Sequence, residues 1–143
     1  MLVILALLVI IAGCNGGKEY CSVVDKRFSC EYSLTENSID VKFMKAPSGK
    51  YYMVAEDLYK VIDEDSGEET RVGECQITGS NFPEEGSTIK FTCLPKEEGR
   101  YTLSFDIKHT EMPSYSPASG ETCLKTSSQW QCTTGGHLSF NVE

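Results

Sequence analysis

The chain has 143 residues, with 13 basic and 21 acidic side chains and a formal net charge of −8. This length suits one domain that buries a hydrophobic core. Because phosphate binding needs clustered Lys and Arg, the acidic balance argues against nucleic acid as a partner.

The chain begins with an unbroken apolar run from Leu2 to Ala12, followed by Gly13 and Cys14. A helix of this length rises only about 16 Å, short of the roughly 30 Å hydrocarbon core, so a membrane span is not expected. The run has the length of the apolar part of a signal peptide, although no Lys or Arg precedes it. A buried N-terminal strand or helix is one alternative. A pilin-type leader, whose apolar helix is normally much longer, is another.

Ile11, Ala12, Gly13 and Cys14 match a lipobox, which has a branched apolar residue, small residues and then a cysteine. The start of the chain therefore resembles the signal peptide of prokaryotic lipoproteins, bacterial or archaeal. This resemblance implies cleavage before Cys14, a lipid on its sulfur, and export to the cell surface or periplasm with the bilayer as a partner. It divides the chain into a signal peptide at 1–13, a lipidated cysteine and flexible tether at 14–19, and a folded domain at 20–143.

The cysteine count fits this division. With Cys14 assigned to lipid, six of the seven cysteines remain, and an even set in an exported protein is typical of disulfides. Zinc sites use cysteines two to four residues apart, whereas the closest pairs here have eight residues between them. We therefore expect three disulfides and no metal or other cofactor. Six cysteines allow fifteen pairings. The strand phases described below favour sequence neighbours, which are Cys21–Cys30, Cys75–Cys93 and Cys123–Cys132.

The first part of the folded domain predicts a hairpin. Residues Tyr20–Val24 and Phe28–Leu34 flank a tight Asp-Lys turn, and their register places Cys21 opposite Cys30. A disulfide between these two cysteines then needs no long reach.

The middle of the chain continues as strands. Apolar and polar residues alternate over Ile39–Phe43, while Tyr51–Ile62 fits both helical spacing and β-favouring composition. We expect a strand at Tyr51–Ile62, because the acidic stretch after it is typical of a hairpin tip leading into Thr70–Ile77. Gly73 marks an expected bulge in that return strand.

The acidic stretch between residues 63 and 69 gathers five carboxylates around Ser66 and Gly67. Carboxylate oxygens suit calcium, but an EF-hand loop needs glycine at its sixth position, and counted from Asp63 it stands at the fifth. A solvated hairpin tip is the preferred interpretation.

The last part of the chain has the clearest alternation. Residues Ser87–Cys93 and Arg100–Lys108 each predict a strand with one buried face, and a further strand covers Leu138–Val142. A turn at Asn81–Glu84 would place Cys75 close to Cys93. We expect a long loop from Thr110 to Gly136.

These segments predict an all-β fold, an antiparallel immunoglobulin-like β-sandwich of about 7–8 strands stapled by disulfides. Residues Lys96–Leu103, with a Gly-x-Tyr step into an alternating strand, resemble the start of a late strand in bacterial and archaeal immunoglobulin-like domains. The wider pattern from Ile39 to Val142 resembles surface domains of archaeal pilin-like and small secreted proteins. No tryptophan lies between two core cysteines as in antibody domains, so the expectation concerns the architecture.

Catalytic motifs are missing from the sequence, and we expect no enzyme and no catalytic residue. His109 and His137 are the only histidines, at the end of one predicted strand and the start of the last. Side by side they would offer two metal ligands, but with no third ligand evident, chance placement on a wet face is the preferred interpretation.

The expected long loop holds the candidate partner-binding residues Tyr115 and Trp130. Large aromatic side chains on constrained loops are common contact anchors. Packing of Trp130 against a neighbouring disulfide is the plainer explanation.

Three classes of function remain open. The first is a membrane-anchored module that binds or adheres to an extracellular protein or polysaccharide. The second is a structural subunit of an envelope or pilus-like assembly, which would use an exposed sheet edge. The third is an enzyme or metal carrier that uses the histidines and the acidic stretch. We expect the first, with the second as its alternative.

Overall fold

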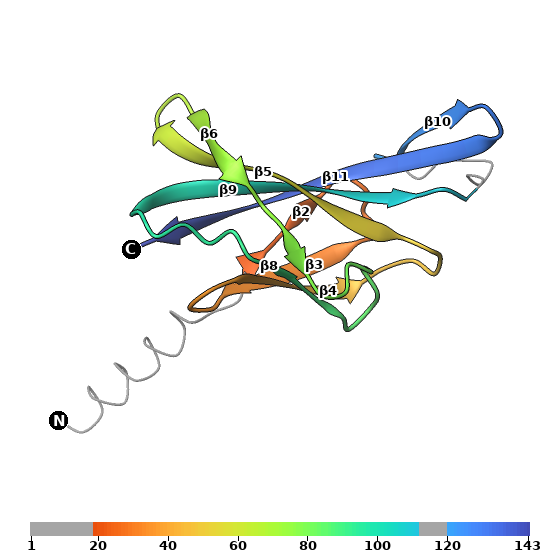
Figure 1. The fold of residues 1–143 in the computed structure, drawn as a ribbon, viewed down its shortest axis with the longest axis horizontal. Coiled ribbons are helices and arrows are strands. Elements are labelled where there is room, and N and C mark those ends of the chain that lie inside the picture. Colours follow the sequence, from red (N-terminus) through yellow and green to blue (C-terminus); the bar gives the residue numbers. More distant parts are fainter. Residues whose placement is uncertain (1–18, 112–119) are drawn as a thin grey trace, which may run out of the picture.

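Two antiparallel sheets pack face to face in the computed structural model of the chain, which describes residues 19–111 and 120–143 (Figure 1). The first sheet has the strand order β1 (Glu19–Tyr20), β3 (Ser29–Leu34), β4 (Ile39–Lys45), β8 (Thr88–Phe91) and β7 (Ile77–Thr78). The second sheet has the order β10 (Thr122–Thr126), β11 (Gln129–Val142), β9 (Gly99–His109), β5 (Tyr52–Asp63) and β6 (Glu68–Glu74). The short strand β2 (Ser22–Val23) also pairs with β11. The expected all-β sandwich is confirmed.

The strand order is that of immunoglobulin-like domains. In chain order β3, β4, β7 and β8 take the places of strands A, B, D and E, and together they make an A-B-E-D sheet. The strands β5, β6, β9 and β11 take the places of C, C′, F and G in the facing sheet. The extra strand β10 lies in the connection between F and G.

The start of β9 carries a second feature of this fold. The Tyr101 hydroxyl donates a hydrogen bond to the Glu97 carbonyl oxygen at 2.8 Å, and the side chain is buried. Immunoglobulin-like sandwiches have such a tyrosine corner at the start of strand F. Gly99, two residues earlier, has a positive φ of 153°, so the Gly-x-Tyr step seen in the sequence is the place where the chain turns into β9.

The core lies between the sheets and follows the alternation of the sequence. The inward-facing side chains of the central strands are all buried: Ile39, Val41, Phe43, Ile89, Phe91, Tyr101, Leu103, Phe105, Ile107, Leu138 and Phe140. Burying a side chain of this kind stabilises the fold by about 1.5–3 kcal/mol. The rings of Phe91 and Phe105 join the two sheets, with their centroids 6.2 Å apart.

The segment from Tyr51 is a strand, as predicted, since β5 covers Tyr52–Asp63. The acidic stretch after it is an exposed turn closed by a 2.8 Å bond from the Gly67 amide to the Asp63 carbonyl. The expected bulge is also present. Leu58 pairs with Gly73 and Tyr59 with Arg71, so Val72 is the extra residue.

Two expectations were wrong in part. The predicted hairpin with β3 holds only as far as Cys21: Tyr20 pairs with Glu31, and the Cys21 amide bonds to the Cys30 carbonyl as its register requires. The chain then crosses from the first sheet to the second, where Val23 pairs with Gly136. The expected long loop from Thr110 to Gly136 contains β10 and the first half of β11. Its sequence shows no apolar alternation, because the inward positions of β11 here hold Cys132, Thr134 and Gly136.

All three expected disulfides are present. They join Cys21 to Cys30, Cys75 to Cys93 and Cys123 to Cys132, with Cα atoms 5.3, 4.8 and 4.0 Å apart. Disulfides persist in oxidising compartments, so they indicate an extracellular-type environment. Within residues 19–111 and 120–143, no helix has the length and apolar character needed to cross a bilayer. The predicted signal peptide and Cys14 lie outside the described residues.

Candidate binding site at the end of the sandwich

The hairpin of β10 and β11 extends past the first sheet at one end of the molecule (Figure 1). It closes at Ser127 and Ser128, between the paired residues Thr126 and Gln129, and Ser127 has the positive φ of 58° that a tight turn requires. The ammonium of Lys125 lies 5.7 Å from the centroid of the Trp130 ring, which is a cation–π contact. Lys125 is exposed and Trp130 half-buried. Trp130 therefore lies on a strand near the hairpin tip, not on a loop.

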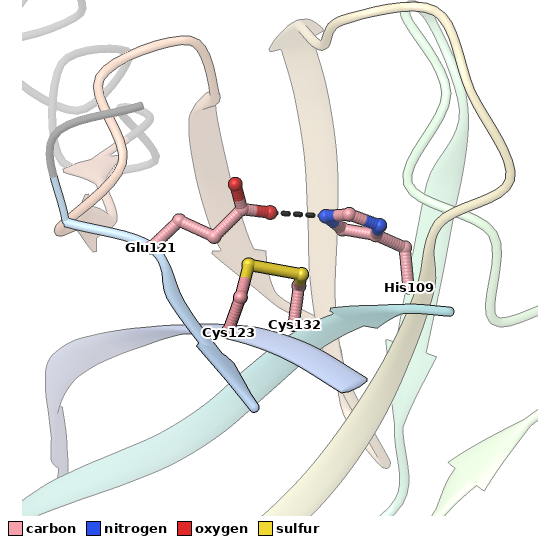
Figure 2. Close-up of side chains that lie close together, drawn as sticks. All are labelled: His109, Glu121, Cys123 and Cys132. Atoms are coloured by element: carbon pink, nitrogen blue, oxygen red, sulfur yellow. Dashed lines mark hydrogen bonds and ion pairs between the residues drawn. A yellow bond between two sulfur atoms is a disulfide. The ribbon is translucent and has the colours of Figure 1, made fainter. Parts of the chain in front are cut away.

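The base of the hairpin is held by a disulfide and a histidine at one level of the sheet. Cys123 pairs with Cys132 across β10 and β11, and Cys132 pairs with His109 across β11 and β9. Paired residues on neighbouring strands point to the same face. Glu121 lies two residues before Cys123 and is buried on this same face, and Figure 2 shows its carboxylate pointing at the His109 ring above the disulfide.

A chain of charges runs from this histidine to the turn after β2. The Nε2 of His109 donates to Glu121 Oε1, and Glu121 Oε2 lies 3.7 Å from an Arg27 guanidinium nitrogen. Arg27 binds both carboxylate oxygens of Asp25, at 2.7–3.2 Å. Asp25 is only 1% exposed, and its amide donates to Thr134 Oγ1 on β11 at 3.1 Å. These contacts fasten the turn, the hairpin base and the end of β9 to one another.

Burial and charge shift several pKa values in this network. Burial alone would raise the pKa of Asp25, but hydrogen bonds and charge from Arg27 outweigh it, and the pKa lies below its ordinary value of 3.8. The same hydrogen bond to Asp25 raises the pKa of Arg27. Burial raises the pKa of Tyr51, whose ring packs edge-on against His109 with centroids 4.9 Å apart. The network is therefore ionised at Asp25 and Arg27 at neutral pH.

A pair of carboxyl groups lies elsewhere on the second sheet. A side-chain hydrogen bond with Asp106, added to burial, raises the pKa of Glu56 to about 7. Glu56 lies at the register shift between Ala55 and Leu58, where β5 bulges against β9. Glu56 therefore exchanges its proton near neutral pH.

The structure separates the two histidines that the sequence singled out. His137 is exposed and pairs with Ser104, whereas His109 pairs with Cys132, five residues away on β11. The interpretation of both as chance residues on a wet face was wrong for His109, which is 7% exposed and bonded to Glu121. The candidate Tyr115 lies outside the described residues.

Sequence reasoning missed Asp25, Arg27, Tyr51 and Glu121. The Asp25-Lys26 pair was interpreted only as a turn. In such a turn an Asp carboxylate can accept hydrogen bonds from the amide and the side chain of an Arg two residues later, as Asp25 does from Arg27. Glu121 stands two residues before Cys123, and that spacing would place it on the face of the disulfide. The partner of Glu121 on β9 was not visible without the strand pairing.

Four possible metal ligands meet at the hairpin base. One ligand atom each from His109, Glu121, Cys123 and Cys132 lies within 4.8 Å of the others. In the present form the two sulfur atoms are bonded to each other, which leaves an imidazole and a carboxylate as free ligands.

Comparisons of the chain with protein-family models, with curated proteins and with solved structures find no match. The projecting hairpin and the network beneath it are therefore the features from which a function can be inferred.

Proposed function

We propose that the protein is an exported lipoprotein, anchored through Cys14, whose immunoglobulin-like sandwich is a non-catalytic binding or adhesion module. The partner is an extracellular protein or polysaccharide. The observation that carries this proposal is the projecting hairpin (Figure 1), in which Trp130 pairs with Lys125 one position before the last strand pair at the tip.

The place of the hairpin in the fold supports a binding role. It occupies the F–G connection, and antibody variable domains use the same connection as one of their binding loops. This comparison is an analogy between folds, so the binding role must also be supported by the side chains of the hairpin.

The side chains at the tip have that chemistry. An indole ring offers a large apolar face at a low cost in conformational entropy, and such rings are enriched where binding energy concentrates. Around Trp130 the hairpin carries hydroxyl and ammonium groups, from Lys125, Thr126 and Ser128. These groups hydrogen-bond protein backbones and sugar hydroxyls alike.

The hairpin is also rigid at its base. The Cys123–Cys132 disulfide and the Glu121 contacts to His109 and Arg27 restrain it on both sides. A restrained binding element loses less entropy when it meets its partner. This arrangement suits recognition by a preformed surface.

The lipobox at Ile11–Cys14 supports the anchor, and the disulfides support export. With the lipid at the N-terminal end of the mature chain, the domain would be held at the membrane and the hairpin would be free to meet partners outside it.

The alternative, a structural subunit of an envelope or pilus-like assembly, would use strand addition at a sheet edge. The edge strand β6 carries four charged side chains, at Glu68, Glu69, Arg71 and Glu74, and charged edges oppose such pairing. This observation argues against assembly through β6.

The test uses Trp130 as its own reporter, since it is the one tryptophan of the chain. The protein is titrated with envelope polysaccharide and with surface-protein fractions from its own cells, and the tryptophan emission is followed. We expect a saturable change in emission with one of these fractions, and loss of retention on that fraction in Trp130→Ala. The matched control is Gln131→Ala, on the opposite face of the same hairpin. Equal retention of both variants would refute the role of the hairpin, and concentration-dependent self-association would favour the subunit.

A further inference from the structure

The base of the hairpin places four metal-binding side chains on one face at one level. Cys123, Cys132 and His109 are consecutive partners across β10, β11 and β9, and Glu121 reaches the same level from just before β10 (Figure 2). Within residues 19–111 and 120–143, no other three His, Cys, Asp or Glu side chains come together closely enough to hold a metal ion.

The ligand types and their spacing suit zinc. Zinc binds thiolate, imidazole and carboxylate groups in a tetrahedron, with bonds of about 2.0–2.3 Å, so its ligand atoms lie about 3.3–3.8 Å apart. The four atoms here lie within 4.8 Å of one another. Small side-chain rotations would therefore bring all four to one ion, provided that the two sulfur atoms are free.

We infer that reduction of the Cys123–Cys132 disulfide converts the hairpin base into a Zn²⁺ site with Cys123, Cys132, His109 and Glu121 as ligands. The reductant is a dithiol. It gives two electrons and two protons to the disulfide, which becomes two thiols, while the dithiol becomes a disulfide. Zinc then binds the two sulfur atoms as thiolates, and their two protons pass to solvent.

The surroundings of the cluster prepare it for a metal ion. The side chains of His109 and Glu121 are 9% and 6% exposed, so little water competes for the site. The second carboxylate oxygen of Glu121 faces Arg27, which Asp25 holds in place. The Tyr51 ring packs against the imidazole and fixes its orientation. Outer contacts of this kind orient metal ligands and raise affinity.

Two thiolates and the Glu121 carboxylate would bring three negative charges to a divalent ion. Arg27, which also pairs with Asp25, lies beside Glu121 and offsets part of the excess negative charge. The pairing of β11 with β9 from Cys132 to Val142 does not depend on this disulfide, so we expect the sheet that carries Cys132 and His109 to persist when it is reduced.

This inference goes beyond the proposed binding function and depends neither on Cys14 nor on Trp130. A zinc-bound hairpin would keep its base closed without a disulfide. Zinc would also protect the two thiolates from reoxidation. The state of the site would therefore depend on both the dithiol and the zinc available.

The experiment compares the oxidised protein with protein reduced by dithiothreitol and freed of it anaerobically. Each form is titrated with Co²⁺, whose visible spectrum reports thiolate ligation and tetrahedral geometry, and then with Zn²⁺ in competition with a chromophoric chelator. We expect one Co²⁺ per reduced chain with thiolate charge-transfer bands, displaced by Zn²⁺, and no such bands in the oxidised form. Glu121→Gln should lower the zinc affinity of the reduced protein by at least about 10-fold.

Two cysteine pairs provide matched controls. Reduced Cys123→Ser/Cys132→Ser should lose the bands, whereas reduced Cys75→Ser/Cys93→Ser should keep them. Equal cobalt spectra for these two variants would overturn the inference, because the metal would then be bound by other thiols. An octahedral spectrum would overturn it as well. So would a reduced protein that loses its strand signal in circular dichroism and does not regain it with zinc.

Discussion

Asp25 is the residue on which the polar end of the sandwich depends. Its carboxylate is buried and receives three hydrogen bonds from the Arg27 side chain and one from the Arg27 amide. Through Arg27 it steadies Glu121 and thus the hairpin base. The Asp25 carboxyl group contributes this stability only while it is ionised.

Asp25→Asn is expected to lower the free energy of unfolding at neutral pH by about 1–3 kcal/mol, because it weakens charge-assisted hydrogen bonds in a buried place. The folded-state pKa of Asp25 is below 3.8, so its contribution is complete above that value and is lost as the pH falls through the folded-state pKa. The difference between wild type and variant should therefore shrink as the pH falls below 3.8. Urea unfolding across pH measures it, with exposed Asp65→Asn as the control. A difference that stays constant as the acid limit of folding is approached would contradict this role.

Glu56 should have the opposite pH dependence. Its pKa is raised to about 7 in the folded state, from an ordinary 4.5, by Asp106. The folded state thus holds a proton that the unfolded state releases, and stability falls as the pH rises from 4.5 to about 7. Glu56→Gln keeps a neutral side chain and should make the protein more stable than wild type at about pH 8. Thermal unfolding at pH 4.5 and at about pH 8 tests this. The control variant Glu36→Gln, in an exposed turn, should be as stable as wild type at both pH values. A variant that is less stable than wild type at both pH values would count against the raised pKa of Glu56.

At the scale of elements, β11 is the strand that joins the parts of the molecule. It pairs with β9 and β10, and also with β2, where the chain arrives from the first sheet. Its first half was missed in the sequence because small and polar residues fill its inward face. Phe105 on β9 occupies the space that a side chain at Gly136 would need.

Gly136 and Gly135 give a matched pair of substitutions within β11. A Cβ at Gly136 would lie 2.4 Å from the buried Phe105 ring, whereas the nearest atom to a Cβ at Gly135 is 3.8 Å away. Gly136→Ala is expected to destabilise the fold by about 1–3 kcal/mol through overpacking. Gly135→Ala should be neutral or slightly stabilising, because alanine loses less backbone entropy on folding. Chemical unfolding of both variants makes the comparison, and equal stabilities would show that the strand has room at both positions.

The contribution of the Tyr101 hydrogen bond to stability can be measured by removing the hydroxyl oxygen atom. Tyr101→Phe keeps the buried ring and leaves the Glu97 carbonyl without its 2.8 Å donor. The expected loss is about 1 kcal/mol. Tyr20→Phe, whose side chain is 77% exposed, should change nothing measurable. An equal effect of the two substitutions would mean that the tyrosine corner does not stabilise this fold.

At the scale of the whole molecule, the sequence predicts the sandwich well and the polar site poorly. Alternation identifies strands wherever one face is apolar, as at Ile39–Phe43 and in β9, and cysteine parity with strand phase leads to all three disulfides. The site depends on strand pairing over long distances in sequence. Asp25 meets Thr134 and His109 meets Cys132 only through the arrangement of the two sheets, which local patterns do not encode.

Intact mass spectrometry of the protein from its native membrane tests most directly the proposed export and lipid anchor, together with the three disulfides. Samples are compared with and without reduction before alkylation. We predict a chain that begins at Cys14 and carries acyl mass, with six cysteines that become alkylated only after reduction. A chain that begins at Met1, carries no acyl mass and reacts at free thiols without reduction would contradict both the anchor and the oxidising environment.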